Sequence, residues 1–358
     1  MASVVRRTDG RPGYIVRWRD ETGRQRKKSF KRSTDAGRFK AQIEHQLLAS
    51  IYVDPSRGRE PFEDYAERWR AKQPHQPSTA NNTRSRLTKH IYPAFKGLSL
   101  AGVRFSDVQA LVSGLDLSPG SVRNVHLILS AIFASALRDR AITDDPTVGV
   151  KLPEYHRSEV QPLTVDQVEA IAIALPQRYR AIAWVAAGTG LRQGEIFGLQ
   201  VRDVNFLKKS LRVERQVQPY GVGRLKNRRA YRSIPVGDVV INALAAHLAE
   251  FPAGPEDFIF RTEDGQPLQR GTMYRPWDRA RRSAGLPDVG MHDFRHFYAS
   301  VLIAAGRPVR EVSDRLGHSN AAMTLNVYSH LWPESQDKTR QAVDDAFKID
   351  PETDTRSA

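Results

Sequence analysis

The sequence predicts an α+β protein of several domains, and three observations support this fold class. The chain has 358 residues, more than one hydrophobic core usually organises. Strand-like alternation near the N-terminus gives way to helical periodicity at residue 34. The proline-containing segment 145–162 has few periodic apolar residues and is interpreted as a linker. We expect a small three-stranded β-sheet plus helix, then an all-α domain, then a mostly α domain with a small antiparallel sheet.

Residues 1–55 are expected to form the first domain. β-Branched and aromatic residues with partial alternation predict strands at 3–7, 14–19 and 26–31. Apolar residues of the following segment recur every three or four positions and predict a helix, with Ala36, Phe39, Ile43 and Leu47 on one face. The stretch carries 13 Lys/Arg against 6 Asp/Glu, so we expect a strongly basic surface.

Residues 60–145 are expected to form a small helical bundle. A polar and basic helix is predicted over 78–90. The clearest helix is predicted over 121–138, where apolar residues form one continuous stripe. Pro119 lies just before this stripe, in a position typical of a helix start.

Residues 160–345 are expected to form the last domain, followed by a flexible tail over 346–358. Thr164 and Gln167 have the spacing of a capping box, which predicts that a helix begins there. Two short strand-like runs, at 210–216 and 231–236, interrupt the helical patterns. They predict the small antiparallel sheet.

The composition is strongly basic, with 55 Lys/Arg against 40 Asp/Glu and a net charge of +15. Such a charge favours a polyanionic partner, nucleic acid first and an anionic membrane second. Because the chain has no cysteine, disulfides, Cys-ligated zinc, iron–sulfur clusters and thiol catalysis are excluded. No apolar run approaches the roughly 20 residues of a membrane span, and the first residues lack the apolar region of a secretory signal. We therefore expect a cytoplasmic protein with no membrane partner.

Four segments of the last domain carry candidate chemistry. They are Gly-Thr-Gly-Leu-Arg-Gln-Gly-Glu-Ile at 188–196, Leu-Lys-Asn-Arg-Arg at 225–229, His-Asp-Phe-Arg-His at 292–296 and Leu-Gly-His-Ser-Asn at 316–320, and Tyr328 follows the last histidine by ten residues. Each motif is weak by itself, but their joint order and spacing are specific. Together they resemble the tyrosine recombinase, or phage integrase, family. The resemblance covers the whole chain in outline and is specific in about the last 200 residues.

Cleavage of a DNA strand without a metal requires a nucleophile, cations for the charge on phosphate, and an acid for the leaving 5′ oxygen. Arginine suits the second role because its planar fork binds phosphate oxygens and keeps its charge. The resemblance implies that Arg192 and Arg295 hold the scissile phosphate. His292 lies three residues before Arg295, on the same helical face. His318 offers an N–H donor to a phosphate oxygen.

The resemblance also implies the acid and the nucleophile. Lys226 precedes Ile234-Pro235 by the spacing at which the family places its catalytic lysine on a β-hairpin, so it is assigned as general acid. Asn227 stands where the family usually has threonine. Tyr328 is the candidate nucleophile; its unperturbed pKa is about 10, and neighbouring cations or a histidine proton acceptor would activate it. The product would be a 3′-phosphotyrosyl link, made and resealed without ATP, metal or cofactor.

Each candidate also has a structural interpretation. Arg192 could simply pair with Glu195, which is itself expected to steady the local structure. Lys226 could be one charge of a phosphate-tracking basic run. For His296, packing and catalysis are equally supported, and His330 is expected to be structural.

Two regions are expected to contact DNA. The middle domain resembles the core-binding domain of the family, with these candidate contacts: Arg84, Arg86, Lys89, Arg123 and Asn124. The first domain resembles an arm-type DNA-binding domain. If Trp18 packs on the helix, Arg17 and Arg19 face DNA, and only one of Lys27 and Lys28 can join them; Lys27 is the candidate. The alternative for each residue is a solvated basic surface.

The resemblance implies a site-specific recombinase, an integrase of a phage or other mobile element. It would act as a homo-tetramer on core and arm attachment sites of double-stranded DNA, with a host DNA-bending factor and an excisionase, in the nucleoid of a bacterial host. One alternative is a catalytically silent, sequence-specific DNA-binding or architectural protein of the same fold. Another is a type IB topoisomerase, which would not need an arm-type domain.

Overall fold

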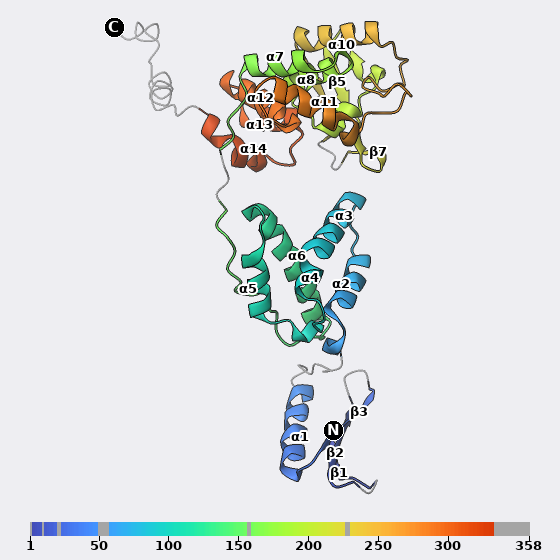
Figure 1. Ribbon diagram of the computed structural model, residues 1–358, viewed down its shortest axis with the longest axis vertical. Helices are drawn as coiled ribbons and strands as arrows, with labels where there is room; N and C mark the ends of the chain where they lie inside the picture. The colour runs from blue at the N-terminus through green and yellow to red at the C-terminus, as the bar shows by residue number, and fades with distance from the viewer. Residues whose placement is uncertain are drawn as a thin grey trace, which may run out of the picture. The chain divides into compact units, whose positions relative to one another are not determined.

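The computed structural model describes residues 2–8, 11–19, 23–48, 57–155, 159–225 and 230–332. The chain divides into two compact units, Met1–His156 and Arg157–Ala358, and each is described by itself. Figure 1 shows a sheet with its helix and a group of helices in the first unit, and helices with small sheets in the second. The division falls within the segment that was predicted to be a linker. The predicted tail at 346–358 lies outside the described residues.

The N-terminal part of the first unit is an antiparallel sheet covered on one face by a helix. Its elements, in chain and sheet order, are β1 (Ser3–Arg6), β2 (Tyr14–Arg19) and β3 (Gln25–Phe30), followed by α1 (Ser33–Leu48). Alternate residues of β2, Val16 and Trp18, are buried against α1. The rings of Trp18 and Phe39 meet edge to face at 5.5 Å. The period-2 pattern of β2 and the helical stripe of α1 therefore meet in one small core.

The rest of the first unit is helical. Its elements are η1 (Arg57–Arg59), α2 (Phe62–Ala71), α3 (Pro77–Arg86), the π-helical turn η2 (Leu87–Ile91), α4 (Tyr92–Ala94), η3 (Leu100–Gly102), α5 (Phe105–Gly114) and α6 (Pro119–Arg138). The helix predicted over 78–90 thus continues through a π turn. Pro93 explains the turn, because its ring would collide with the carbonyl of residue 89 in a regular α-helix. The N–H of Tyr92 reaches back five residues to the carbonyl of Leu87, which widens the helix there.

Helix α6 lies at the centre of this helical core. Its residues Val125, Leu129, Ile132 and Phe133 are fully buried and pack with Phe62 of α2. By length and composition, α6 is the one helix in the described ranges that could cross a membrane. The expectation that no segment approaches such a span was therefore wrong for α6. Burial of its apolar stripe accounts for this composition, because core helices pass the same test.

The second unit is mostly helical, with two small antiparallel sheets. Its helices are α7 (Val165–Ala174), α8 (Gln177–Thr189), α9 (Gln193–Phe197), η4 (Val201–Asp203), α10 (Asp238–Glu250), α11 (Arg270–Ser283), α12 (Met291–Ala304), α13 (Val309–Leu316), α14 (Ala321–Tyr328) and η6 (Ser329–Leu331). One sheet has the order β4 (Val204–Asn205), β5 (Ser210–Val213), β8 (Arg232–Pro235); the other is the hairpin β6 (Arg215–Gln218) with β7 (Gly221–Arg224).

In this unit, one local prediction is confirmed, the capping box at Thr164, and one is wrong, the single strand over 210–216. The capping box is present: the backbone N–H of Thr164 donates to the Gln167 side chain at 2.9 Å, and the N–H of Gln167 to the Thr164 hydroxyl at 3.2 Å. The single strand predicted over 210–216 is instead two strands in different sheets, separated at Glu214. The predicted α+β class, with three such parts in this order, is confirmed.

Candidate active site

The C-terminal end of α13 gathers three arginine side chains. The last carbonyls of a helix have no partner within the helix and carry its negative dipole end. Here the carbonyls of residues 315–317 accept hydrogen bonds in turn from Arg232 Nε at 2.8 Å, Arg295 Nη2 at 2.7 Å and Arg192 Nη2 at 3.5 Å. Gly317 ends the helix in a left-handed conformation, φ +65°, and a Cβ there would lie 2.8 Å from Arg232 Nη1. The Leu-Gly pair of the fourth motif therefore makes room for the arginines.

Arg295 is the most deeply buried of the three, with 2% of its surface exposed. Besides the carbonyl of Leu316, it donates from Nη1 to the carbonyl of Gly190 at 2.6 Å. Burial, together with the positive charge of Arg192, lowers the pKa of Arg295 to about 9. Arg295 therefore remains a cation at neutral pH, held between the ends of α8 and α13.

Glu195 connects the other two arginines. Its buried carboxylate accepts from Arg192 Nη1 at 2.9 Å and from Arg232 Nη2 at 2.9 Å. Burial alone would raise the pKa of Glu195, but the ion pairs with Arg232 and Arg192 outweigh it and the pKa lies below its ordinary value. The Arg192 side chain remains 39% exposed, so its guanidinium is open to a ligand while one edge is fixed by Glu195.

The two histidines of the candidate set are uncharged at neutral pH. Burial, reinforced by Arg295, Arg192 and Arg232, lowers the pKa of His318 to about 3. Its Nδ1 lies 2.8 Å from the Thr324 hydroxyl, which is also buried. Burial and the charge of Arg295 also lower the pKa of His292. Both rings can therefore act as neutral hydrogen-bonding groups beside the arginines.

Tyr328 ends α14, and only 1% of its surface is exposed. Its hydroxyl lies 2.8 Å from Nδ1 of His296 on α12. The His296 ring in turn meets the His292 ring edge to face, at 4.8 Å. Helix α12 thus carries His292, Arg295 and His296 toward the cluster, and the tyrosine contacts the histidine whose role the sequence left open.

The structure brings five of the six predicted catalytic residues into this region: Arg192, His292, Arg295, His318 and Tyr328. The sixth, Lys226, lies outside the described residues, as does Asn227; the hairpin β6–β7 ends at Arg224, just before them. Within the described ranges, no three His, Asp or Glu side chains are grouped as a metal site would require.

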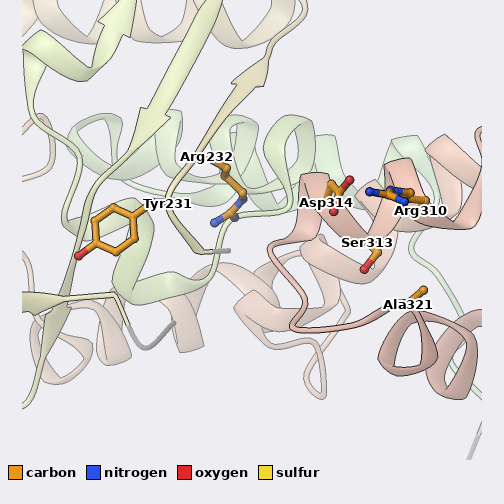
Figure 2. Close-up of a pocket in the computed structure, with 6 residues that line it drawn as sticks. All are labelled: Tyr231, Arg232, Arg310, Ser313, Asp314 and Ala321. Atoms are coloured by element: carbon orange, nitrogen blue, oxygen red, sulfur yellow. The ribbon is translucent and has the colours of Figure 1, made fainter. Parts of the chain in front are cut away.

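Arg232 was not among the predicted residues. Its side chain is 7% exposed. It borders a pocket that lies between the beginning of β8 and helices α13 and α14. Figure 2 shows the residues that line this pocket: Tyr231, Arg232, Arg310, Ser313, Asp314 and Ala321. The strand pattern held a signal for Arg232, because it shares a face of β8 with the buried Ile234 and a charge on that face needs partners.

The predicted DNA contacts of the N-terminal sheet lie on one face. Arg17 and Arg19 are exposed and point away from α1, since Trp18 between them is buried. Lys27 pairs with Arg17 across the strands and so shares that face. Lys28 is on the other face, with its ammonium 4.5 Å from the Phe39 ring. Of the two lysines, Lys27 therefore shares the face of Arg17 and Arg19, and its contact with DNA stays a prediction.

The predicted contacts of the helical region divide into two groups. Arg84 and Lys89 are exposed and Arg86 is half-buried. Arg123 donates from Nη2 to the carbonyl of Pro153 at 3.2 Å, and Asn124 donates to the carbonyl one turn before it on α6 at 2.9 Å. The last two side chains therefore already have partners within the protein.

Helix α11 carries a basic surface that the sequence reasoning missed. Arg270, Arg275 and Arg279 are exposed, and within the described residues none has a side-chain hydrogen bond or ion pair. By contrast, Arg281 and Arg282 both pair with Asp278. Arg270 and Tyr274 line a groove with Gln193, the neighbour of Arg192. The clustering of arginines in residues 270–282 was the available signal.

Comparisons with known proteins point to one family of DNA-processing enzymes. The phage integrase family profile matches residues 161–334. The chain is 28% identical to a tyrosine recombinase XerC-like protein of Caldanaerobacter subterraneus over 64% of this chain and 67% of that protein. It is also 28% identical to the prophage phiRv2 integrase of Mycobacterium tuberculosis, over 85% of this chain and 84% of the relative.

Solved structures share the fold. The Tn1549 transposon integrase in complex with a circular intermediate DNA matches with a TM-score of 0.64 at 21% identity, over 79% of this chain and 98% of that one. A lambda integrase dimer bound to a COC′ core site matches with a TM-score of 0.63 at 20% identity, over 93% and 95%. Taken with the four motifs and the arginine–tyrosine cluster, these similarities support the assignment of the chain to the tyrosine recombinase family.

Proposed function

We propose that the protein is a site-specific DNA recombinase, an integrase that cuts and rejoins DNA to integrate or excise a phage or other mobile element. The observation that carries the proposal is the convergence of Arg192, Arg295 and the neutral His318 on the end of α13, close to the tyrosine that ends α14. Membership of the family supports DNA cleavage and rejoining.

In the proposed reaction, the Tyr328 oxygen attacks the scissile phosphorus and the bond to the 5′ oxygen breaks. Arg192, whose guanidinium is partly open, binds a non-bridging oxygen, and Arg295 adds its positive charge from below the surface. His292 and His318 offer neutral N–H donors to the same phosphate. The 3′-phosphotyrosyl link preserves the energy of the broken bond, so a 5′ hydroxyl can later attack it and reseal a strand.

We assign Lys226 as the acid that protonates the leaving 5′ oxygen. We further propose that neither a metal ion nor ATP takes part. The two arginines provide the positive charge that a metal would otherwise supply, and resealing draws on the phosphotyrosyl bond. Full cleavage in the presence of EDTA and without nucleotide is the expected result.

The basic surfaces suggest how the protein would hold double-stranded DNA. We propose that residues 1–55 bind arm sites through the face that carries Arg17, Arg19 and Lys27. We propose that residues 60–145 bind the core site, with exposed Arg84 and Lys89 and half-buried Arg86 near phosphates. We propose that residues 160–345 also contact the DNA backbone, through Arg270, Arg275 and Arg279 of α11. Arg123 and Asn124 remain candidates only if DNA displaces their present partners.

Assembly is proposed by analogy with the family. A lambda integrase tetramer bound to a Holliday junction shares this fold, with a TM-score of 0.59 at 20% identity. We propose that this chain also acts as a homo-tetramer, with a host DNA-bending factor and an excisionase, on nucleoid DNA in the bacterial cytoplasm. Analytical ultracentrifugation with a four-way junction would test this; a complex of one or two protomers at saturation would contradict it.

Covalent trapping tests the function directly. The protein is incubated with a nicked suicide duplex of its attachment site, with EDTA, and denatured before electrophoresis. A protein–DNA adduct is expected for the wild type and not for Tyr328→Phe. Tight specific binding with no adduct would instead indicate a catalytically silent DNA-binding protein. Relaxation of any supercoiled plasmid, without site preference, would indicate a topoisomerase.

A further inference from the structure

The proposed mechanism leaves one question about its first step: where the proton of the Tyr328 hydroxyl goes. Phenol at its ordinary pKa of about 10 is protonated at neutral pH and is a weak nucleophile until a base accepts its proton. A candidate base must lie within hydrogen-bonding distance of the hydroxyl. Three histidines of the cluster could in principle serve: His292, His296 and His318.

The geometry points to His296: we propose that its Nδ1 holds the Tyr328 hydroxyl and accepts its proton during attack on DNA, an inference that rests on the proposed function. Nδ1 and the hydroxyl oxygen are 2.8 Å apart, and the two rings meet at 67° with centroids 5.5 Å apart. The phenol O–H is the stronger acid of the pair and donates to the ring nitrogen. With 1% of its surface exposed, the tyrosine has exchanged water for this contact.

The other two histidines are placed for different roles. Within the described residues, His292 makes no hydrogen bond to Tyr328; its ring contacts His296 instead, and the neighbouring Arg295 and Arg192 oppose a further positive charge on it. His318 Nδ1 is engaged by the Thr324 hydroxyl. Because His292 and His296 are four residues apart on α12, one helix face carries a ring for the phosphate and a ring for the nucleophile.

The step balances without any further reactant. The bond from Tyr328 oxygen to phosphorus forms, the bond from phosphorus to the 5′ oxygen breaks, the phenolic proton moves to His296 Nδ1, and the 5′ oxygen takes a proton from the acid assigned to Lys226. During resealing, the imidazolium returns its proton to the departing tyrosine oxygen.

Two substitutions separate basicity from positioning. Asparagine places its carbonyl oxygen near the position of Nδ1, so His296→Asn can still accept the hydrogen bond but cannot take up the proton. His296→Ala removes both capacities. We expect both variants to bind the attachment site as the wild type does and to form the covalent complex about 10²-fold more slowly, within the usual range for loss of a general base. His75→Asn, an exposed histidine of the first unit, is the matched control and should cleave normally.

A sulfur-substituted substrate distinguishes base from acid. In a duplex with sulfur in place of the bridging 5′ oxygen, the leaving thiolate needs no protonation. Lys226→Ala should therefore recover on this substrate, whereas His296→Asn and His296→Ala should remain slow, because the tyrosine must still lose its proton. Added imidazole should partly restore His296→Ala, which has room for it.

Three results would overturn the proposal. The first is cleavage at the wild-type rate by His296→Asn, and the second is recovery of either His296 variant on the sulfur substrate. The third is that His292→Asn, and neither His296 variant, remains slow on the sulfur substrate. If His296→Ala loses DNA binding, His296→Asn still decides the question. Failure of the proposed function looks different, because the wild type itself would then form no covalent complex on either substrate.

Discussion

Arginine occupies two contrasting settings in the second unit. At the end of α13, Arg295 is buried and the side chain of Arg232 is 7% exposed, and their guanidinium groups are bound to backbone carbonyls or to Glu195. Along α11, Arg275 and Arg279 are exposed and, among the described residues, make no ion pair. The same side chain is fixed in one place and solvated in the other.

The contrast follows from the energetics of burial. A buried cation is stable only when fixed hydrogen-bond partners replace its water. Those partners therefore fix the position of the charged group. An exposed arginine keeps its water and its freedom, which suits contact with a DNA backbone of variable position. The buried group therefore supplies placed charge for chemistry, and the exposed group supplies affinity.

The largest effect is expected for Arg295→Met. Cleavage should fall about 10²–10³-fold, because a placed positive charge near the phosphate is lost. The carbonyls of Gly190 and Leu316 would each lose a donor, so the free energy of unfolding should also fall, by about 1–3 kcal/mol for each unsatisfied group. Suicide-substrate cleavage and urea unfolding measure the two effects. Normal cleavage by a folded variant would remove Arg295 from the site.

The next effect is expected for Arg232→Met. This change leaves the buried Glu195 with Arg192 as its remaining ion-pair partner, so we expect a loss of about 3 kcal/mol in the free energy of unfolding. A double-mutant cycle with Glu195→Gln should show strong coupling, since the two side chains are 2.9 Å apart. Additive effects would mean that Glu195 and Arg232 act independently.

A smaller effect is expected from pH. The pKa of His318 is lowered to about 3 in the folded protein, whereas its unfolded value is about 6.5, so the unfolded chain binds more protons between these values. Stability should thus fall as pH drops below about 6.5, by about 1 kcal/mol from this residue between pH 7.5 and 5.5. Urea unfolding of the wild type and His318→Asn across that range measures it; equal slopes would contradict the assignment.

The smallest effect on folding is expected for Arg275→Ala and Arg279→Ala. Each should change the free energy of unfolding by less than about 0.5 kcal/mol. Each should also weaken DNA binding and reduce the slope of log K against log salt by about 1. Arg202→Ala, whose side chain pairs with Glu256, is the matched control and should leave the slope unchanged. An unchanged slope for both α11 variants would mean that the DNA backbone does not contact α11.

Elements with local causes were predictable from the sequence. The capping box at Thr164, the alternation that buries Trp18, and the apolar stripe of α6 each depend on residues a few positions apart. The motif order likewise predicted a shared site for Arg192, His292, Arg295, His318 and Tyr328, because each segment stands at a spacing typical of the family. The break at Glu214 and the π turn before Pro93 were not predicted, since they depend on which strand or helix turn accepts each backbone hydrogen bond.

The sequence by itself determined the fold class, the basic charge and the residue types available for phosphate chemistry. Only the tertiary structure decided which of them meet. Glu195 and Arg232 are 37 residues apart and Arg232 bonds the carbonyl 83 residues on, while His296 and Tyr328 are 32 apart. Such contacts arise when separate elements pack on one core, and no local periodicity encodes them. The partners of the arginines and the histidine at the tyrosine were therefore visible only in the folded chain.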